Sequence, residues 1–193
     1  MEIGTQPSKG WIEVICGSMF SGKTEEFIRR IKRVEFAKQK YALFKPKTDD
    51  RFHKTKIVTR SHEISVESVI LSAEDPSEIF SYIDDSVRIV GIDEAQFFQK
   101  SLVDVCKELA NRKIRVIVAG LDMDFLGNGF GPIPELLAVA EYVKKVHAIC
   151  IDCGDTASHS LRIIDTKELV AVGDEGEYKA VCRACYLKAQ EGK

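Results

Sequence analysis

The sequence contains no apolar run that approaches the ~20 residues of a membrane-spanning helix, so nothing in it suggests a transmembrane segment. Residues 1–10 also lack the hydrophobic core of a signal peptide, and we therefore expect a cytoplasmic protein with no membrane partner. Positive charge is not in excess, because 28 Lys and Arg are balanced by 30 Asp and Glu, for a formal net charge of −2. That balance argues against bulk binding of nucleic acid through phosphate neutralisation.

Cysteines are few and unevenly placed. The chain has 193 residues, enough for one ordinary domain with a small appendage, and enough to bury a core without disulfides. Of its six cysteines, Cys16 and Cys106 stand alone, and the other four come in two pairs after residue 149. We expect a loose N-terminal arm over residues 1–10, an α/β domain over 11–149, and a metal-binding lobe with a C-terminal tail over 150–193.

One stretch carries a phosphate-binding signature, G-x-x-x-x-G-K-[ST], and all eight of its residues are candidates to hold a nucleoside triphosphate: Gly17, Ser18, Met19, Phe20, Ser21, Gly22, Lys23 and Thr24. An apolar run over 11–16 precedes it and a helical pattern follows, which is the context that the motif needs. Gly17 and Gly22 let backbone N–H groups point at phosphate oxygens, and the helix N-terminus adds its positive dipole end. Lys23 would neutralise β- and γ-phosphate charge, and the Thr24 hydroxyl would bind Mg²⁺.

A second apolar run, over 87–92, ends in two carboxylates, Asp93 and Glu94. A strand that ends in Asp is typical of a Walker B element, in which the carboxylate holds Mg²⁺ beside the phosphate loop. Glu94 can then point to another part of the cleft and act as general base. An acidic pair that merely follows a strand explains the same residues, and the upstream phosphate loop favours the functional interpretation.

Two further loops are open to more than one interpretation. Residues 47–54 are polar and charged, so Asp49 can support Mg²⁺ and Arg51 can reach a phosphate. From the residues alone, however, a solvated charged loop is the favoured interpretation. Residues 120–132 are rich in glycine, which predicts mobility. Phe125 and Phe130 in this loop can stack on a planar ring or pin the loop to the core.

The four remaining cysteines form two C-x-x-C pairs, separated by residues 154–181: Cys150, Cys153, Cys182 and Cys185. Each pair can present two thiolates from a tight turn, and together they complete a tetrahedral Zn²⁺ site with no open position, which predicts a structural metal. The four histidines are scattered, and we assign them no ligand role. The intervening segment is rich in acidic residues, which disfavours a zinc-ribbon adaptor for nucleic acid.

Hydrophobic patterning and turn signals predict the remaining elements. We expect strands over 41–45, 64–71, 114–119 and 145–149, and helices from Asp75 to about Ile83, from 100 to 112, from 134 to 142, and from Tyr186 onward. In the cysteine lobe we expect strands over 161–164, 169–172 and 178–182.

Four segments together resemble the type II, cytosolic-type thymidine kinase family in its bacterial form. They are Gly17–Glu26, the Asp-Glu-Ala-Gln-Phe-Phe of 93–98, the Gly-Leu-Asp-Met-Asp-Phe of 120–125, and Cys182–Cys185. The resemblance is collinear from about Gly10 to the end of the chain. It implies a P-loop NTPase (RecA-like) α/β fold with a mostly parallel sheet, and a small β-rich zinc-binding lobe that carries a lasso loop, here about 154–173.

The resemblance also implies an activity and a set of site residues. The γ-phosphoryl group of ATP would pass to the 5′-hydroxyl of thymidine, and usually of deoxyuridine, with Glu94 as the base and Lys23 and Arg51 assisting. Asp49, Asp93 and Gln96 would belong to the ATP and Mg²⁺ side. The positions that match the nucleoside pocket are Met19, Phe97, Leu121, Phe125, Phe130, Ser160, Leu169, Val170, Ala171, Val172, Gly173 and Tyr178.

Three features depart from the family pattern. Ser160 stands where Thr is common, Leu126 and Gly129 replace a basic residue and a proline, and residues 60–63 match only loosely.

The family is typically a homotetramer inhibited by thymidine triphosphate (dTTP), so we expect both here, with no nucleic-acid partner. The alternatives are another P-loop nucleoside kinase or a small ATPase and, less favoured, a zinc-ribbon nucleic-acid adaptor with an ATP switch.

Overall fold

The computed structural model describes residues 9–47, 56–58, 65–164 and 176–191. Its main feature is a six-stranded sheet in the order β5-β2-β6-β7-β1-β8, in which every neighbouring pair is parallel. The strands are β1 (Trp11–Cys16), β2 (Tyr41–Pro46), β5 (Val69–Leu71), β6 (Ile89–Ile92), β7 (Arg115–Gly120) and β8 (Tyr142–Lys145). The expected α/β fold with a mostly parallel sheet is confirmed.

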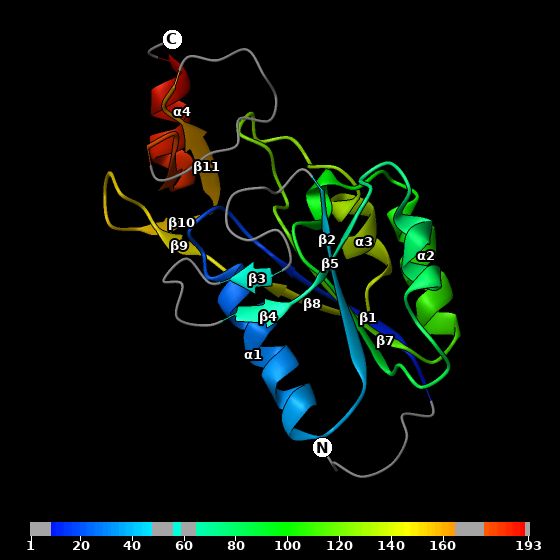
Figure 1. Cartoon of the computed structure of the whole chain (residues 1–193). Helices are drawn as coiled ribbons and strands as arrows, with labels where there is room; N and C mark the ends of the chain where they lie inside the picture. The colour runs from blue at the N-terminus through cyan, green and yellow to red at the C-terminus, as the bar shows by residue number, and fades with distance from the viewer. Residues whose placement is uncertain (1–8, 48–55, 59–64, 165–175, 192–193) are drawn as a thin grey trace.

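Helices cover both faces of this sheet (Figure 1). Helix α1 (Lys23–Phe36) buries Phe27, Ile28, Ile31 and Val34, which recur at helical spacing, on one face. Helices α2 (Leu102–Asn111) and α3 (Ile133–Val139) and the 3₁₀ helix η1 (Pro76–Ser81) pack on the other. Successive strand residues point to opposite faces, so Val14 packs with α2 and α3 while Ile15 packs with α1. Burial on both sides explains why the inner strands β6 and β7 are nearly continuous apolar runs, whereas the edge strand β8 is exposed and carries two lysines.

A small β lobe follows the sheet. Strands β9 (Ala148–Ile149) and β10 (Thr156–Ala157) pair antiparallel, as do β11 (His159–Arg162) and β12 (Tyr178–Val181), and helix α4 (Arg183–Glu191) closes the lobe. A further antiparallel pair, β3 (Lys56–Val58) and β4 (Ser65–Glu67), places Ile57 and Val66 in the cluster around α1. The expected small β lobe is thus confirmed. Its predicted strand over 169–172 lies outside the described residues.

Some element boundaries differ from those predicted. Helix α3 ends at Val139, and the single strand expected over 145–149 is divided between β8 and β9. Strand β8 begins earlier, at Tyr142, because its residues pair in register with Glu13–Cys16 of β1, and β9 covers Ala148–Ile149. The helix after Asp75 is a 3₁₀ helix, although the Asp75 side chain caps it as expected by accepting from the Ser77 N–H. Helix α4 begins three residues before Tyr186, at Arg183.

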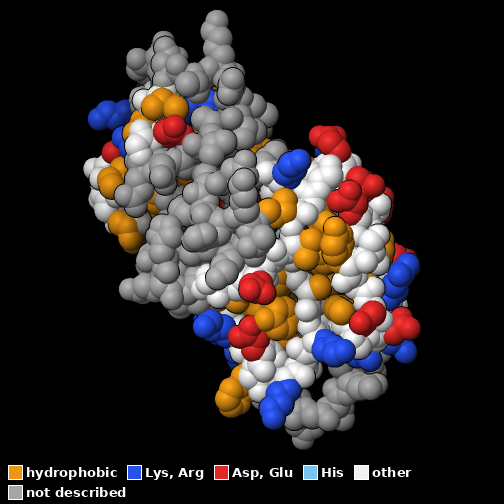
Figure 2. All heavy atoms as spheres, viewed as in Figure 1, with side chains coloured by type: hydrophobic (Ala, Val, Ile, Leu, Met, Phe, Trp, Pro, Cys, Tyr) orange, Lys and Arg blue, Asp and Glu red, His pale blue; other side chains and the backbone are white. Residues whose placement is uncertain are grey.

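The described part of the chain shows neither a membrane-spanning helix nor, on the face drawn in Figure 2, a stripe of positive charge. None of its helices has the length and apolar character to cross a membrane. On the face in Figure 2, the Lys and Arg side chains of the described residues are interspersed with Asp and Glu rather than gathered in one stripe.

Candidate active site

The sheet brings the sequence motifs to one edge. Because all its strands are parallel, the carboxyl ends of β1, β6 and β7 lie at the same edge, where α/β folds hold their ligands. Strand β7 lies between β1, which leads into the phosphate loop, and β6, which leads into Asp93. A cavity of about 260 Å³ opens there. Its walls are Met19, Phe20, Ser21, Gly22, Lys23, Thr24, Glu25, Glu94 and Leu121.

The phosphate loop runs from the end of β1 to the start of α1, as the motif predicts. Gly22 adopts a left-handed conformation, with φ of 83°, immediately before the helix begins at Lys23. Inside the loop, the Ser18 carbonyl oxygen accepts hydrogen bonds from Ser21 Oγ and Lys23 Nζ, both at 2.7 Å. The lysine head therefore lies over the loop, beside the backbone that surrounds the cavity.

Asp93 and Glu94 occupy different environments. The Asp93 carboxylate is buried and accepts a hydrogen bond of 2.9 Å from the Glu94 N–H, whereas Glu94 lines the cavity. Glu94 has a left-handed backbone, with φ of 50°, a conformation uncommon outside glycine and frequent at functional sites. Gln96 holds the Glu94 carboxylate, because its Nε2 donates to Glu94 Oε2 at 2.5 Å while its Oε1 accepts from the Leu121 N–H at 3.0 Å. One amide thus links the ends of β6 and β7.

The glycine-rich loop after β7 is tied down at several points. Asp124 Oδ1 accepts from the backbone N–H groups of Leu126 and Asn128, both at 2.9 Å, which closes the turn. The Phe125 carbonyl accepts from the Tyr186 hydroxyl of α4 at 3.0 Å. These bonds restrain a loop for which glycine content predicted mobility. Phe130, further along, packs edge-to-face on Phe97 with ring centroids 5.6 Å apart.

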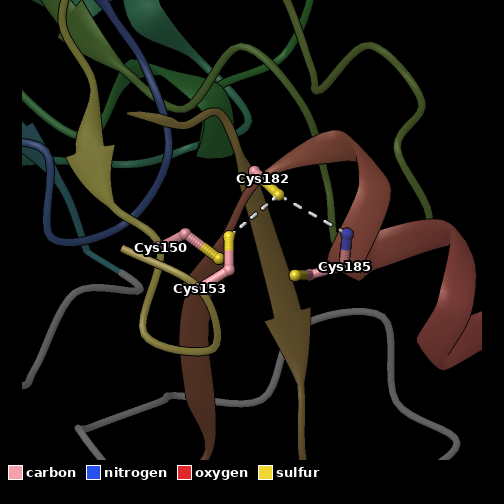
Figure 3. A group of neighbouring side chains, drawn as sticks. All are labelled: Cys150, Cys153, Cys182 and Cys185. Atoms are coloured by element: carbon pink, nitrogen blue, oxygen red, sulfur yellow. Dashed lines mark hydrogen bonds between the residues drawn. The ribbon is translucent and has the colours of Figure 1, made fainter. Parts of the chain in front are cut away.

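The four paired cysteines converge in the small lobe (Figure 3). The sulfur atoms of Cys150, Cys153, Cys182 and Cys185 all lie within 4.8 Å of one another. Cys153 Sγ is 3.6 Å from Cys182 Sγ, and the Cys185 N–H donates to Cys182 Sγ at 3.5 Å. Two turns present the four thiols, one after β9 and one at the start of α4. Four converging sulfurs without a carboxylate form a donor set that suits zinc.

Comparison with known proteins decides the family. The thymidine kinase family model matches residues 10–186, which is nearly the whole chain. The chain belongs to the thymidine kinase family. The thymidine kinase of Bacteroides thetaiotaomicron is 52% identical over 183 residues, covering 94% of this chain and 89% of that protein. The thymidine kinases of a Rhodothermus species and of Porphyromonas gingivalis are 51% and 48% identical, covering 93% of this chain and 82% and 86% of those proteins.

Not every site residue expected of a thymidine kinase can be placed. The phosphate loop, Glu94 and Leu121 share the cavity, and Asp93 and Gln96 lie beside it. Phe97 and Phe130 form one aromatic pair, whereas Phe125 contacts the small lobe. Ser160 bonds to the phosphate loop through the Met19 N–H. Outside the described residues lie Asp49, Arg51, Leu169, Val170, Ala171, Val172 and Gly173.

Sequence reasoning missed Arg162. This arginine is only 4% exposed, and its guanidinium lies 3.7 Å from the centre of the Phe125 ring. Its Nε and Nη2 donate to the Tyr178 hydroxyl at 3.0 and 2.6 Å. The period-two alternation of β11 was the available signal, because it puts Arg162 on the same face of the strand as Ser160.

Proposed function

We propose that this thymidine kinase family member transfers the γ-phosphoryl group of ATP to the 5′-hydroxyl of thymidine, and also of deoxyuridine, in pyrimidine salvage. One observation carries the proposal: Glu94 lies on the wall of the cavity that the phosphate loop forms, so a base and a phosphate site face the same space. The same base could activate water in an ATPase, so the choice of a nucleoside as acceptor rests on the family. The names of the similar proteins, all thymidine kinases, support the choice of acceptor.

The proposed residue roles follow from this arrangement. Glu94 accepts the 5′-hydroxyl proton as the oxygen attacks the γ-phosphorus, and the bond from that phosphorus to the β–γ bridging oxygen breaks to release ADP. Gln96 orients Glu94 through the 2.5 Å bond. Lys23 neutralises phosphate charge, and Arg51 assists it. Mg²⁺, when bound, would offset charge on the phosphates, and Thr24, Asp93 and Asp49 would supply the oxygen ligands that suit it.

The nucleoside would lie between the sheet and the small lobe. Met19 and Leu121 line the cavity. Phe97 packs on Phe130, and Phe125 and Tyr178 both contact Arg162; the family resemblance supports these four aromatic residues as part of the nucleoside pocket. Aromatic walls with a few fixed polar groups suit a pyrimidine ring. The cysteine cluster would hold structural Zn²⁺. The family resemblance further supports residues 169–173 as part of a lasso loop, a homotetramer, feedback inhibition by dTTP, and a cytoplasmic location.

A nucleoside panel tests the proposal. The protein is incubated with Mg²⁺, ATP labelled on the γ-phosphate, and each of thymidine, deoxyuridine, deoxycytidine and deoxyadenosine in turn. We expect labelled monophosphate from thymidine and deoxyuridine. Release of free phosphate without labelled monophosphate would identify an ATPase, and preferential labelling of deoxycytidine or deoxyadenosine would identify another nucleoside kinase.

A further inference from the structure

The small β lobe contacts the phosphate loop directly. The backbone N–H of Met19, in the middle of the loop, donates a hydrogen bond of 3.0 Å to the Oγ of Ser160 on β11. These two residues are 141 positions apart in the chain. Met19 is 6% exposed and Ser160 is 5% exposed, so water has little access to replace either partner. The bond therefore joins two distant elements in a dry place.

Phe20 provides a second contact between the loop and the lobe. Its side chain packs against the hydrophobic cluster of the small lobe, which contains Ala148, Leu161 and Tyr186. Its backbone φ is 63°, in the left-handed region that disfavours a large side chain. Such a conformation persists where the surroundings hold it. Packing against the lobe supplies that support, so two adjacent loop residues keep their positions through the lobe.

The start of the loop is held by the segment that leads into the lobe. The Val146 N–H donates to the Cys16 carbonyl oxygen at 2.8 Å. A Cβ atom on Gly17 would lie 2.1 Å from the Val146 carbonyl oxygen, closer than any side chain tolerates. The chain therefore passes tightly against the loop before it enters the lobe. Contacts at Gly17, Met19 and Phe20 together make the loop and the lobe one packed unit.

We propose that Ser160 is a positioning residue for the phosphate loop, so that the small lobe contributes to the affinity for ATP. The inference rests on the nucleotide-binding part of the proposed function. The family resemblance places Ser160 at the nucleoside, whereas its hydroxyl here serves the nucleotide side by accepting from Met19. Without that hydroxyl, the buried Met19 N–H loses its acceptor, and the loop loses one of the contacts that fix its shape.

A matched pair of variants isolates the hydroxyl. Ser160→Thr keeps it, Ser160→Val has nearly the same shape as the threonine variant without it, and Ser160→Ala removes it without added volume. The measurement is the Kd of a non-hydrolysable ATP analogue with Mg²⁺, by calorimetry and in the absence of nucleoside. We expect Ser160→Thr to bind within about twofold of the unmodified protein, and Ser160→Val and Ser160→Ala to bind about tenfold more weakly. Zinc content and thermal midpoint are measured alongside. We expect equal zinc content within the Thr and Val pair, and a lower thermal midpoint for Ser160→Val because the buried Met19 N–H has lost its acceptor.

Equal affinity of the Thr and Val variants for the analogue, with any change confined to the KM for thymidine, would overturn the proposal. Hydrogen exchange of the Met19 amide tests the bond in the unmodified protein, should a variant fail to fold. Slow exchange is expected, and exchange at the rate of an exposed amide would overturn the proposal. Because analogue binding requires no nucleoside, a panel that yields no monophosphate would reject the proposed reaction and leave the Thr and Val comparison interpretable.

Discussion

The sheet domain and the small β lobe are held together by different means. The sheet buries large aliphatic and aromatic side chains on both faces, such as Phe27, Phe44 and Ile117. The lobe buries mostly small ones, such as Ala148, Ala157 and Ala180, next to its cysteine cluster. Burial of apolar area stabilises by about 25 cal/mol per Å², so the sheet can form by burial while the lobe gains little from it. A bound metal would supply what the lobe lacks.

The two regions also differ in role, because the sheet domain carries the groups proposed to react and the lobe carries side chains that hold them in place. The phosphate loop, Asp93 and Glu94 are all on the sheet domain, at the ends of β1 and β6. The lobe contributes side chains that hold those parts or the aromatic residues around them: Ser160, Arg162 and Tyr186. The difference predicts that variants of the two regions will have distinct effects on turnover, metal content and substrate affinity.

The largest expected effect is on turnover, from Glu94→Gln. The variant keeps the shape and an oxygen that can accept from Gln96, but it cannot take a proton. We expect kcat for thymidine to fall about a thousandfold, while the affinity for an ATP analogue and the metal content stay near their original values. Steady-state kinetics and calorimetry check this.

Glu108→Gln is the control for that variant. Glu108 is an exposed carboxylate on α2 that pairs with Arg112, away from the cavity. We expect its loss to leave turnover within about twofold, since exposed pairs contribute little. A Glu94→Gln protein that keeps a tenth or more of its turnover would show that another group accepts the proton.

The next effect is on the metal, from Cys153→Ser. Removing one of four converging sulfurs leaves an incomplete donor set, and we expect the affinity for zinc to fall by on the order of a hundredfold or more. Limited proteolysis should then cut within the lobe and spare the sheet. Cys106→Ala is the matched control, because Cys106 lies on α2 and is buried in the core of the sheet domain, outside the four-cysteine cluster. Undiminished zinc content in Cys153→Ser, measured by emission spectroscopy, would reject the site.

Sequence patterns correctly predicted the features that depend on residues close together in the chain or on a restricted spacing. The aliphatic run that forms β1, the loop between β1 and α1, and the four-cysteine cluster were all predicted. Each depends on neighbours a few residues away, or on a spacing that chemistry restricts. The register of β8 was not predictable in this way, because pairing with β1 decides which residues form the strand. The same holds for η1, where packing of Ile79 accompanies a 3₁₀ rather than an α-helical turn.

The contacts between the sheet and the lobe were not predicted from the sequence. The bond from Met19 to Ser160 joins residues that no period or motif connects. Arg162 carries a charge, and a charge in a β segment predicts exposure, yet two aromatic rings and a hydroxyl make its burial tolerable. Asp49 and Arg51 lie outside the described residues, so their roles stay predictions.

A smaller effect is expected on the KM for thymidine, from the variant Arg162→Met. The guanidinium stacks on Phe125 and donates two hydrogen bonds to the Tyr178 hydroxyl, so it fixes two proposed pocket residues. Losing charged hydrogen bonds of this kind costs about 2 kcal/mol, which corresponds to roughly a thirtyfold rise in the KM for thymidine. The KM for ATP should change less than about threefold.

Arg162→Lys provides the comparison, because it keeps the charge and loses the planar fork. We expect its KM for thymidine to lie between that of the unmodified protein and that of Arg162→Met. A variant Arg162→Met with full zinc content and an unchanged KM for thymidine would show that Phe125 and Tyr178 hold their positions without the arginine.

The smallest expected effect is on stability at acid pH, where unfolding of the sheet domain and loss of zinc from the lobe can be measured separately. Glu13 on β1 accepts hydrogen bonds from Arg115 Nε at 2.6 Å, Arg30 Nη1 at 2.6 Å and Trp11 Nε1 at 2.5 Å. Burial opposes ionisation of Glu13, but the bonds from Arg115 and Trp11 and the charges of Arg115 and Arg30 outweigh it, so its pKa is lowered. On α1, hydrogen bonding to Arg29 is the main cause that lowers the pKa of Glu26 to about 2.

A carboxyl whose pKa is lower in the folded state stabilises the protein above its unfolded pKa, and this stabilisation is lost as the pH falls through the folded value. The stabilisation that Glu26 contributes is therefore lost as the pH falls from about 4.5 to about 2. Trp11 is the single tryptophan and bonds to Glu13, so its fluorescence reports on the sheet domain, while zinc release reports on the lobe. We expect Glu13→Gln to lower the free energy of unfolding at pH 7 by about 2 kcal/mol, because the hydrogen bonds from Arg115 and Arg30 lose their charged acceptor. The variant should also weaken the acid dependence that Trp11 detects without altering the pH of zinc release. Equal urea midpoints at pH 7 for the variant and the unmodified protein would show that the arginines around Glu13 add nothing to the stability of the sheet.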